Sequence, residues 1–466
     1  MYSTTTTVLK ASRNFGNFLM IPNPFPDFIY NSTEVKTLRC GKQAHLFHGD
    51  LYLSEEDRIC PYCGTAMEVN QTFHTPLYHV PFGEACTGIL VDKHQFLCPT
   101  CKRTVMQKIP FQAEHHRITR GLEAYIYGLL GDGLQHKEIA RITGISPRVI
   151  GNIDRERLKA LYTENGKLKK PERQATAIAI DEFSLHRFHR YATSVIDLET
   201  GHIIWIQEGK KKDVVYDFIR HVGLDWMKRV KVVSCDMNSD FEEAFRELCP
   251  HLKIVFDRFH IVKNFNDMVI TTVRREEQKR LEEAGDKEAA KSLKNSRYIL
   301  LSNPETLARK DQMANEAKPG RRESAVFPVR SASRKGGNQA RYEALLKENE
   351  LFFAMDLVKE MLRRLFSRTT VDEMESDIEE IVQTCNSTNN IHFEKFAELI
   401  GNHADGIVSH AIFPVSSGKI EGINNMIKTI RRSAYGYNDD EYFFLKAMDQ
   451  SRRIYVRNPK SHKIFQ

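Results

Sequence analysis

Hydrophobic residues follow two different spacings along the chain. Between residues 120 and 161 they recur every three or four positions, which is typical of amphipathic helices. Between residues 175 and 257 short runs rich in β-branched residues alternate with helical stretches, which predicts strands joined by helices. Helical spacing returns after residue 271 and continues through much of the chain to residue 411. The pattern predicts an all-α segment, an α/β segment and a long second α segment.

The α/β segment has a definite order of elements. Its first three strands are predicted at 175–181, 191–197 and 202–208, with a short turn between the last two. A helix follows, and then strand, helix, strand and helix, at 213–228, 230–236, 240–248, 253–257 and 259–269. This is the order of a ribonuclease-H-like fold, in which the first and fourth strands are neighbours and parallel connections need crossover helices.

Three acidic residues occupy informative places in this pattern. Asp181 and Asp236 end the first and fourth predicted strands, and Glu421 opens a helix-like stretch late in the chain. If the two strands are neighbours, their ends lie together and the two carboxylates can share a metal site. Mg²⁺ and Mn²⁺ prefer oxygen ligands, and two ions about 3.5–4 Å apart stabilise an in-line displacement at phosphorus. One strand-end Asp is usually a turn or cap residue, but two in these positions and a later Glu favour a catalytic site.

Asp257 and His260 form a second group of candidates. Asp257 ends the fifth predicted strand, so it competes with Asp236 for the second position of the metal site. We rank Asp236 first because the fourth strand is the expected neighbour of the first. His260 could donate a hydrogen bond to a phosphate or orient a carboxylate, and it could equally be a structural residue at a helix start.

Two Cys-x-x-Cys motifs predict a metal site near the N-terminus. Cys60 and Cys63 form the first, and Cys98 and Cys101 form the second, with 34 residues between the motifs. Two thiolates three positions apart on a tight turn can hold one side of a tetrahedral ion, so the two motifs together predict a structural Zn²⁺. Four thiolates leave no open position for a substrate. The alternative, a redox-active pair, is disfavoured because neither motif opens a βαβ unit.

The all-α segment predicts a DNA-binding helix-turn-helix. Helices are expected at 120–130 and 135–143, and a Gly turn then leads to a third helix that begins at Ser146 and Pro147, an N-cap followed by a first-turn proline. A helical hairpin that serves only as scaffolding is the alternative.

The third helix of this segment carries the residues expected to contact DNA. Arg148, Asn152 and Arg155 are its exposed polar candidates for the major groove. Lys and Arg outnumber Asp and Glu by 14 to 7 between residues 102 and 170, which equals the whole net charge of +7. A basic block of this kind favours a phosphate-backbone partner over a plain solvated surface.

Length and composition narrow the class of protein further. A chain of 466 residues with 41% hydrophobic residues has room for several folded domains. It has no run of about 18 apolar residues and no signal-peptide pattern at its start, and its nine cysteines are an odd number. These features argue against a membrane protein and a secreted disulfide scaffold, and favour a reducing cytoplasm.

Four short strings resemble those of a known family. They are Ile-Asp-Glu-Phe at 180–183, Asp-Met at 236–237, Asp-Arg-Phe-His at 257–260 and Gly-Lys-Ile-Glu-Gly-Ile-Asn-Asn at 418–425. The zinc motifs and the helix-turn-helix precede them in the same order as in that family. The chain therefore resembles bacterial insertion-sequence DDE transposases of the ISL-three family over nearly its whole length.

The resemblance implies an activity and its residues. Asp181, Asp236 and Glu421 match the family's DDE triad, and Asp257 and His260 match its Asp-Arg-Phe-His string. Such an enzyme binds the terminal repeats of its element, hydrolyses a DNA strand with Mg²⁺ or Mn²⁺, and joins the freed 3′-hydroxyl to target DNA. The expected partners are double-stranded DNA and further copies of the chain, as a homodimer or higher assembly on the bacterial nucleoid. Two alternatives stay open: a DNA-binding regulator with a silent core, and a ribonuclease-H-like nuclease.

Three basic residues follow Glu421 on its predicted helix. Lys428, Arg431 and Arg432 lie about two to three turns further on, where they could contact the phosphates of the scissile DNA. A solvated helix face is the alternative.

These expectations divide the chain into five segments and leave one loop undecided. The segments are a zinc-binding domain (1–110), a helix-turn-helix (111–172), the first part of the α/β core (173–270), a helical insertion (271–411) and the last part of the core with the catalytic Glu (412–466). The insertion contributes most of the 163 residues that separate Asp257 from Glu421. Its stretch 318–341, rich in basic residues, is predicted to be a mobile loop that contacts DNA or is simply a linker.

Overall fold

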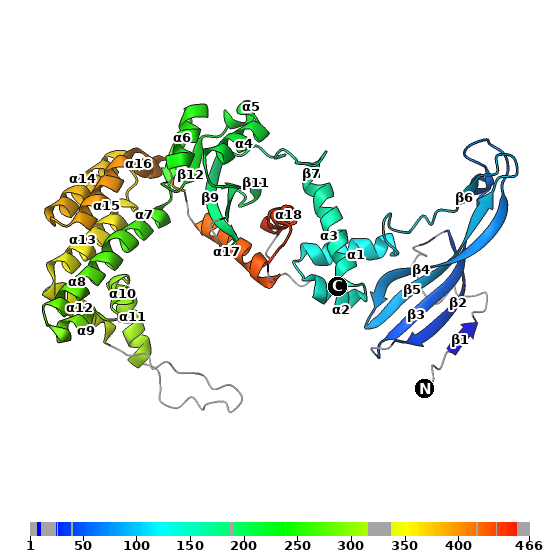
Figure 1. The fold of residues 1–466 in the computed structure, drawn as a ribbon, viewed down its shortest axis with the longest axis horizontal. Helices are drawn as coiled ribbons and strands as arrows, with labels where there is room; N and C mark the ends of the chain where they lie inside the picture. The colour runs from blue at the N-terminus through cyan, green and yellow to red at the C-terminus, as the bar shows by residue number, and fades with distance from the viewer. Residues whose placement is uncertain are drawn as a thin grey trace, which may run out of the picture. The chain divides into compact units, whose positions relative to one another are not determined.

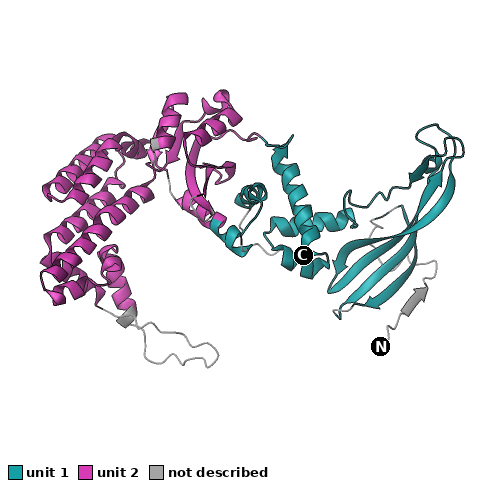
Figure 2. Cartoon of the chain, viewed as in Figure 1, with its two compact units in different colours: residues 1–169, 428–466 teal, residues 170–427 magenta. Residues whose placement is uncertain are grey.

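The chain forms two compact units in the computed structural model. The described residues are 7–10, 25, 27–38, 41–186, 190–237, 239–315, 337–415, 418–434 and 436–453. The first unit comprises residues 1–169 and 428–466, and the second comprises residues 170–427 (Figure 2). This division differs from the five segments expected from sequence, whose boundaries stay a prediction.

A six-stranded sheet opens the first unit (Figure 1). Its strands are β1 (Thr7–Lys10), β2 (Phe28–Thr37), β3 (Gln43–Leu51), β4 (Glu68–Phe82), β5 (Ala85–Leu97) and β6 (Thr104–Met106). The order is β1-β2-β3-β5-β4, and β6 also pairs with β5. Strand β4 is 15 residues long and contains Pro76 and Pro81. It tolerates them because it ends the sheet order, and an edge strand has one side that needs no N–H donor.

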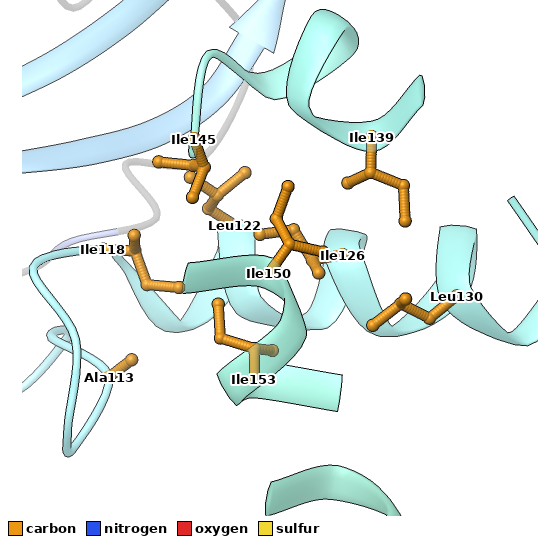
Figure 3. Close-up of a cluster of buried hydrophobic side chains, with 9 residues drawn as sticks. All are labelled: Ala113, Ile118, Leu122, Ile126, Leu130, Ile139, Ile145, Ile150 and Ile153. Carbon is orange, nitrogen blue, oxygen red and sulfur yellow. The ribbon is translucent and has the colours of Figure 1, made fainter. Parts of the chain in front are cut away.

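Three helices follow this sheet, with bounds within one residue of the predicted ones. They are α1 (Arg120–Gly131), α2 (His136–Thr143) and α3 (Pro147–Tyr162). The hydroxyl of Ser146 accepts a hydrogen bond from the N–H of Val149, which confirms the expected N-cap of α3. Nine buried side chains fill the space between the helices (Figure 3): Ala113, Ile118, Leu122, Ile126, Leu130, Ile139, Ile145, Ile150 and Ile153. A two-stranded hairpin, β7 (Thr163–Glu164) and β8 (Lys167–Leu168), follows α3.

The second unit contains a five-stranded mixed sheet. Its strands are β9 (Ala177–His186), β10 (Arg190–Asp197), β11 (Ile203–Glu208), β12 (Val232–Cys235) and β13 (Lys253–Phe256). The order is β11-β10-β9-β12-β13. Strands β9, β10 and β11 are antiparallel neighbours, whereas β12 lies parallel to both β9 and β13. The predicted neighbourhood of the first and fourth strands is therefore confirmed.

Helices α4 (Lys212–Val222), α5 (Leu224–Met227) and α6 (Ser239–Leu248) supply part of the core beside this sheet. The single helix expected at 213–228 is interrupted at Gly223, whose φ of 93° lies in the region that favours glycine. Phe218 of α4 is fully buried, and its ring lies 5.6 Å from that of Trp205 on β11.

A long helical segment of the second unit follows β13 (Figure 1). It contains α7 (Arg258–Phe265), a π-helical turn η3 (Asn266–Thr271), α8 (Thr272–Glu283), α9 (Lys287–Leu293), α10 (Arg297–Leu300), α11 (Pro304–Asn315), α12 (Asn338–Glu348), α13 (Glu350–Leu365), α14 (Val371–Ser387), α15 (Ile391–Asn402) and α16 (Ala404–Ile412). Residues 318–336 of the loop predicted at 318–341 lie outside the described residues. The last residues of the predicted loop belong to the start of α12.

The last helix of this insertion returns to the sheet at a position where only glycine fits. Helix α16 packs on β13, and a Cβ added to Gly406 would lie 2.3 Å from Cε2 of Phe256. Phe256 is the last residue of β13, directly before Asp257. The last helix of the insertion is thus held next to Asp257, one of the candidate site residues.

Two helices close the described chain. Helix α17 (Gly418–Ser433) begins in the second unit, and α18 (Asp440–Ser451) packs on α3 in the first unit. Among the described residues, no helix combines the length and apolar character needed to span a bilayer.

Candidate catalytic and metal-binding sites

Asp181 lies in the middle of a strand, not at its end as predicted. The parallel pairing of β9 with β12 stops at Ala179, but β9 continues along β10 to His186. The sequence suggested a strand end because the apolar run stops at residue 180, whereas the continuing strand is stabilised by Phe183 and Leu185, which are buried. Asp181 itself is only 6% exposed.

The two carboxylate oxygens of Asp181 each accept one hydrogen bond from a neutral donor. Oδ1 accepts from the backbone N–H of Glu182 at 2.8 Å, and Oδ2 accepts from Nδ2 of Asn424 at 2.5 Å. Burial raises the pKa of Asp181, and the nearby charge of Asp236 adds to this effect, although His260 and the bond from Asn424 oppose it. The carboxylate therefore lacks a full counter-charge.

Asp236 directly follows β12, as predicted, and contacts His260. Its Oδ1 accepts from the N–H of Met237 at 2.7 Å, and its Oδ2 lies 3.0 Å from Nδ1 of His260. Burial acts against ionisation of Asp236, but the hydrogen bond and charge of His260 outweigh it and lower the pKa. The pKa of His260 is raised in turn: burial alone would lower it, but the hydrogen bond to Asp236 and the charges of Asp236, Asp181 and Asp257 together outweigh burial. The contact between Asp236 and His260 thus favours the charged form of each group.

Asp257 caps helix α7 and faces the other side of His260. Its Oδ1 accepts from the N–H of Phe259 at 2.9 Å, and its Oδ2 lies 3.9 Å from Nε2 of His260. It is 7% exposed. Both candidates for the second carboxylate therefore lie beside one imidazole, and the preference for Asp236 stays a prediction.

Glu421 lies in the first turn of α17 and is exposed. Two contacts near it tie α17 to the sheet: the bond from Asn424 to Asp181, and the bonds from Nζ of Lys419 to the carbonyl oxygens of Leu198 and Glu199, each 2.7 Å. Within the described part of the chain, the three predicted carboxylates are not a group whose ligand atoms gather within 4.8 Å. The structure brings Asp181, Asp236, Asp257 and His260 into one electrostatic cluster, with Glu421 on the adjoining helix.

Oxygen atoms near Asp181 fit a divalent cation. Oδ1 of Asn424, whose Nδ2 donates to Asp181, is buried and has no hydrogen-bond partner among the described residues. A buried oxygen without a partner costs about 1–3 kcal/mol, so an occupant that satisfies it is expected. Carboxylate and amide oxygens are the ligands that Mg²⁺ and Mn²⁺ prefer. The donor set is therefore suitable for these ions.

Lys419 and Asn424 did not emerge as site residues from the sequence, although a signal was present. Both lie in the string at 418–425 that carries the resemblance. Asn424 follows Glu421 by three positions, and residues three apart share one face of a helix. An Asn on the face of the expected catalytic Glu could have been singled out for this reason.

The four predicted zinc ligands come together in the first unit. The sulfur atoms of Cys60, Cys63, Cys98 and Cys101 all lie within 4.8 Å of one another. The Sγ atoms of Cys60 and Cys101 are 3.6 Å apart, and those of Cys63 and Cys98 are 3.4 Å apart. A tetrahedral Zn²⁺ with bonds of about 2.3 Å needs sulfur atoms about 3.8 Å apart, so the cluster fits this ion. Hydrogen bonds with Thr65 lower the pKa of Cys63 to about 6, whereas burial and the neighbouring cysteines outweigh the backbone bond with Arg103 and raise the pKa of Cys101 to about 11.

The three candidate DNA contacts on α3 differ in their surroundings. Arg148 and Asn152 are exposed and lie one turn apart. The Nε of Arg155 instead donates to Oδ2 of Asp439 at 3.3 Å, and its guanidinium lies over the ring of Tyr442 at 4.9 Å. Of the three residues, Arg148 and Asn152 are better placed to contact DNA.

A buried polar network joins α3 to α18, and the sequence did not predict it. Asp154 is fully buried, and it accepts hydrogen bonds from the Tyr442 hydroxyl at 2.7 Å, from Nζ of Lys446 at 2.8 Å and from Nη2 of Arg157 at 3.1 Å. Nη1 and Nη2 of Arg157 also donate to the two oxygens of Asp449, at 3.1 and 2.8 Å. We call these five residues the Asp154 network.

The charged side chains of the Asp154 network have counter-charges within the protein. Burial acts against ionisation of Asp154, but the bond with His136 and the charge of Lys446 outweigh it and lower the pKa. Burial likewise opposes the charge on Arg157, and Asp449 and Asp154 outweigh it and raise the pKa. The protein supplies the counter-charges of both groups.

The basic residues beyond Glu421 line the second half of α17. Lys428 and Arg432 are exposed, and Arg431 is half-buried. Their contact with DNA stays a prediction.

Comparison with known proteins identifies the class. A sequence family described as transposase, the DDE transposases of the ISL3 type, matches residues 178–447, which is more than half of the chain and includes the three predicted carboxylates. The chain therefore belongs to the ISL3 family of insertion-sequence transposases, as its motifs predicted.

Two relatives illustrate how far the similarity extends. The transposase for insertion sequence element IS1001 of Bordetella parapertussis is 26% identical over 389 residues, which cover 83% of this chain and 87% of the relative. The transposase for insertion sequence element IS1557 of Mycobacterium tuberculosis is 23% identical over 371 residues, which cover 75% of this chain and 76% of the relative.

Proposed function

We propose that this transposase binds the terminal repeats of its element and catalyses metal-dependent DNA strand cleavage and strand transfer. The observation that carries the proposal is the environment of Asp181. This buried carboxylate lies close to Asp236 and accepts a hydrogen bond from the helix that carries Glu421. A buried carboxylate whose two hydrogen-bond donors are neutral, in a chain of this family, fits a cation site better than a structural ion pair.

The proposal includes a ribonuclease-H-like core. The order β11-β10-β9-β12-β13, with its antiparallel and parallel halves, supports this assignment. Asp181 lies on β9 and Asp236 directly follows the neighbouring strand β12, although the two residues are 55 positions apart in sequence. We keep Asp236 as the second member of the triad because it directly follows β12, the strand that pairs with β9, whereas Asp257 caps α7.

Each residue of the site has a task in this proposal. Bound Mg²⁺ or Mn²⁺ would supply the positive charge that stabilises the attacking and leaving oxygens at phosphorus. Asp181, Asp236 and Glu421 would hold the ions, and the N–H groups of Glu182 and Met237 fix the first two carboxylates. His260 orients Asp236 and, as a cation, can donate to a phosphate oxygen.

The first unit would recognise the element ends. Helices α1 to α3 with their Ser146 cap support a helix-turn-helix, and Arg148 and Asn152 are its exposed candidates for base contacts. Zn²⁺ on the four cysteines would stabilise the preceding sheet. Lys428 and Arg432 would contact phosphates, and two copies of the chain would hold the two ends of the element.

The test separates DNA binding from chemistry. We expect Asp181→Ala, Asp236→Ala and Glu421→Ala to abolish cleavage of a duplex that carries a terminal repeat, while the affinity for that duplex stays unchanged. Arg148→Ala should instead weaken binding to this duplex by about 1–3 kcal/mol, although it leaves the catalytic residues intact. Gel-shift and cleavage assays on the same preparations measure both properties.

Three outcomes would count against the proposal. Excision that is unchanged in Asp181→Ala or Glu421→Ala would show that these residues are not catalytic. Cleaved ends that are never joined to target DNA would indicate a nuclease. If Asp257→Ala is inactive and Asp236→Ala is fully active, Asp257 and not Asp236 is the second member of the triad.

A further inference from the structure

We propose that Asn424 is a positioning residue: its amide N–H fixes helix α17 on the carboxylate of Asp181, so that Glu421 faces the same divalent ion. The inference rests on the proposed metal site and adds a residue to it. Nδ2 of Asn424 donates to Oδ2 of Asp181 at 2.5 Å, and Glu421 lies three positions earlier on the same helix face.

The hydrophobic side of α17 does not determine where the helix sits along its axis. Its buried residues are Ile420, Ile423 and Ile427, and half-buried Ile430 continues the same stripe. A stripe with this spacing nearly repeats after one turn, so a shift of about 5.4 Å would still bury isoleucines. The same shift would carry Glu421 away from any ion held by Asp181, because a bond to Mg²⁺ is about 2.1 Å long.

Polar contacts select one register from these alternatives. Asn424 binds Asp181 on β9, and Lys419, five positions earlier, binds the carbonyl oxygens of Leu198 and Glu199 in the turn after β10. Both contacts would break on a one-turn shift. Only the contact of Asn424 ends on a residue of the proposed metal site.

A second observation points to a ligand at Asn424. Its Oδ1 is buried and has no hydrogen-bond partner among the described residues. In the same carboxamide, Oδ1 and Nδ2 are about 2.2 Å apart by covalent geometry, so this oxygen also lies close to Asp181. An asparagine that only joined a helix to a sheet would be expected to have both ends satisfied. The unpartnered oxygen fits a side chain whose second half faces an ion or its water.

The test measures metal affinity and does not depend on activity. Zinc-replete full-length protein without DNA is titrated with Mn²⁺, and free Mn²⁺ is followed by electron paramagnetic resonance. We expect Asn424→Ala to weaken Mn²⁺ binding about 10–100-fold, the range found for partners that orient metal ligands. Asn425→Ala is the matched control, because Asn425 is the next residue of α17 and is exposed. Its affinity should stay within about twofold of the wild type.

The outcomes distinguish this inference from the proposed function. Wild-type Mn²⁺ affinity in Asn424→Ala, with weakened affinity in Asp181→Ala, would overturn the role of Asn424 and leave the metal site standing. Wild-type affinity in both variants would overturn the metal site itself. A lower stability of metal-free Asn424→Ala with unchanged affinity of the folded protein would show a merely structural asparagine.

A conservative variant keeps the test decisive if the alanine variant does not fold. Asn424→Ser retains a hydrogen-bond donor on a shorter side chain. We expect it to bind Mn²⁺ more weakly than the wild type and, where both variants fold, more tightly than Asn424→Ala. Unchanged affinity in Asn424→Ser would contradict the inference as well.

Discussion

Asp154 and Asp181 are both buried aspartates, yet their surroundings have opposite effects on their charge. Asp154 receives hydrogen bonds from two cationic side chains, Lys446 and Arg157, and its pKa is lowered. Asp181 receives hydrogen bonds only from neutral N–H groups in the contacts described above, and burial raises its pKa. In the first unit the protein itself neutralises the buried charge, whereas in the second it leaves a charge that an external cation can neutralise.

This difference separates a structural acid from a candidate functional one. Burial alone does not, because both residues are almost inaccessible to solvent, at 0% and 6% exposure. The distinguishing property is whether the partners satisfy the carboxylate with opposite charge. Three measurements test whether the two aspartates differ in this way.

The largest effect is expected from Asp154→Asn. It keeps the shape of the side chain but leaves Lys446 and Arg157 without a full counter-charge, and breaking a buried pair in this way costs about 3–5 kcal/mol. Native-state hydrogen exchange of amides in α3 and α18 measures the loss within the first unit.

The matched control for this prediction is Asp439→Asn. Asp439 pairs with Arg155 in the same helix pair, but its side chain is 42% exposed. Exposed pairs contribute at most about 1 kcal/mol, so the control should change little. Equal losses in the two variants would mean that the buried network has no special weight.

A smaller effect is expected when Mg²⁺ is added. At a free concentration ten times its Kd, a ligand that binds only the folded state stabilises it by about 1.4 kcal/mol. The tryptophans of the chain, Trp205 and Trp226, both lie in the second unit, so their fluorescence reports the unfolding of that unit. Asp181→Asn should remove the stabilisation by Mg²⁺. A magnesium effect that survives this substitution would place the ion elsewhere.

The smallest effect is a pair of opposite pH dependences, each at most about 1.4 kcal/mol per pH unit for one proton. The pKa of Asp154 is lowered on folding, so its contribution to the first unit is present above about pH 4 and is lost as the pH falls through the folded-state pKa. The pKa of Asp181 is raised, so its neutral form favours the folded, metal-free second unit, and this contribution is lost as the pH rises through the folded-state pKa.

Urea unfolding between about pH 3 and pH 6 tests the two slopes, since this range brackets the unfolded pKa of Asp. Tryptophan fluorescence follows the second unit, and hydrogen exchange follows the first. Asp154→Asn and Asp181→Asn should each flatten one slope and leave the other. Slopes of the same sign in both units would contradict the comparison.

The sequence predicted those parts of the fold that local patterns determine. The helices α1, α2 and α3 have clear apolar spacing and a Ser-Pro start, and the strands of the second unit are short apolar runs. The N-terminal sheet was largely missed because strands such as β2 (Phe28–Thr37) consist mostly of polar residues and partly exposed positions. Their pairing partners, not their hydrophobicity, define them as strands.

Local patterns in the sequence also indicated the candidate site residues. They did not indicate the contacts that support these residues. Asp236 lies at a strand end that its own sequence marks, whereas the extension of β9 past Asp181 depends on pairing with β10. The bond from Asn424 to Asp181 joins residues 243 positions apart, and the bond from Lys446 to Asp154 joins residues 292 positions apart. Contacts over such separations leave no periodic signal along the chain.

The contact of Gly406 with Phe256 bears on how such a chain can change in length. Because α16 is fixed against β13, the helical insertion leaves and rejoins the sheet at nearly the same place, and it behaves as a closed loop. The entropic cost of closing a loop grows only with the logarithm of its length, by about 0.6 kcal/mol for each doubling. Lineages could therefore lengthen or shorten this segment almost freely, provided that the glycine at position 406 is kept.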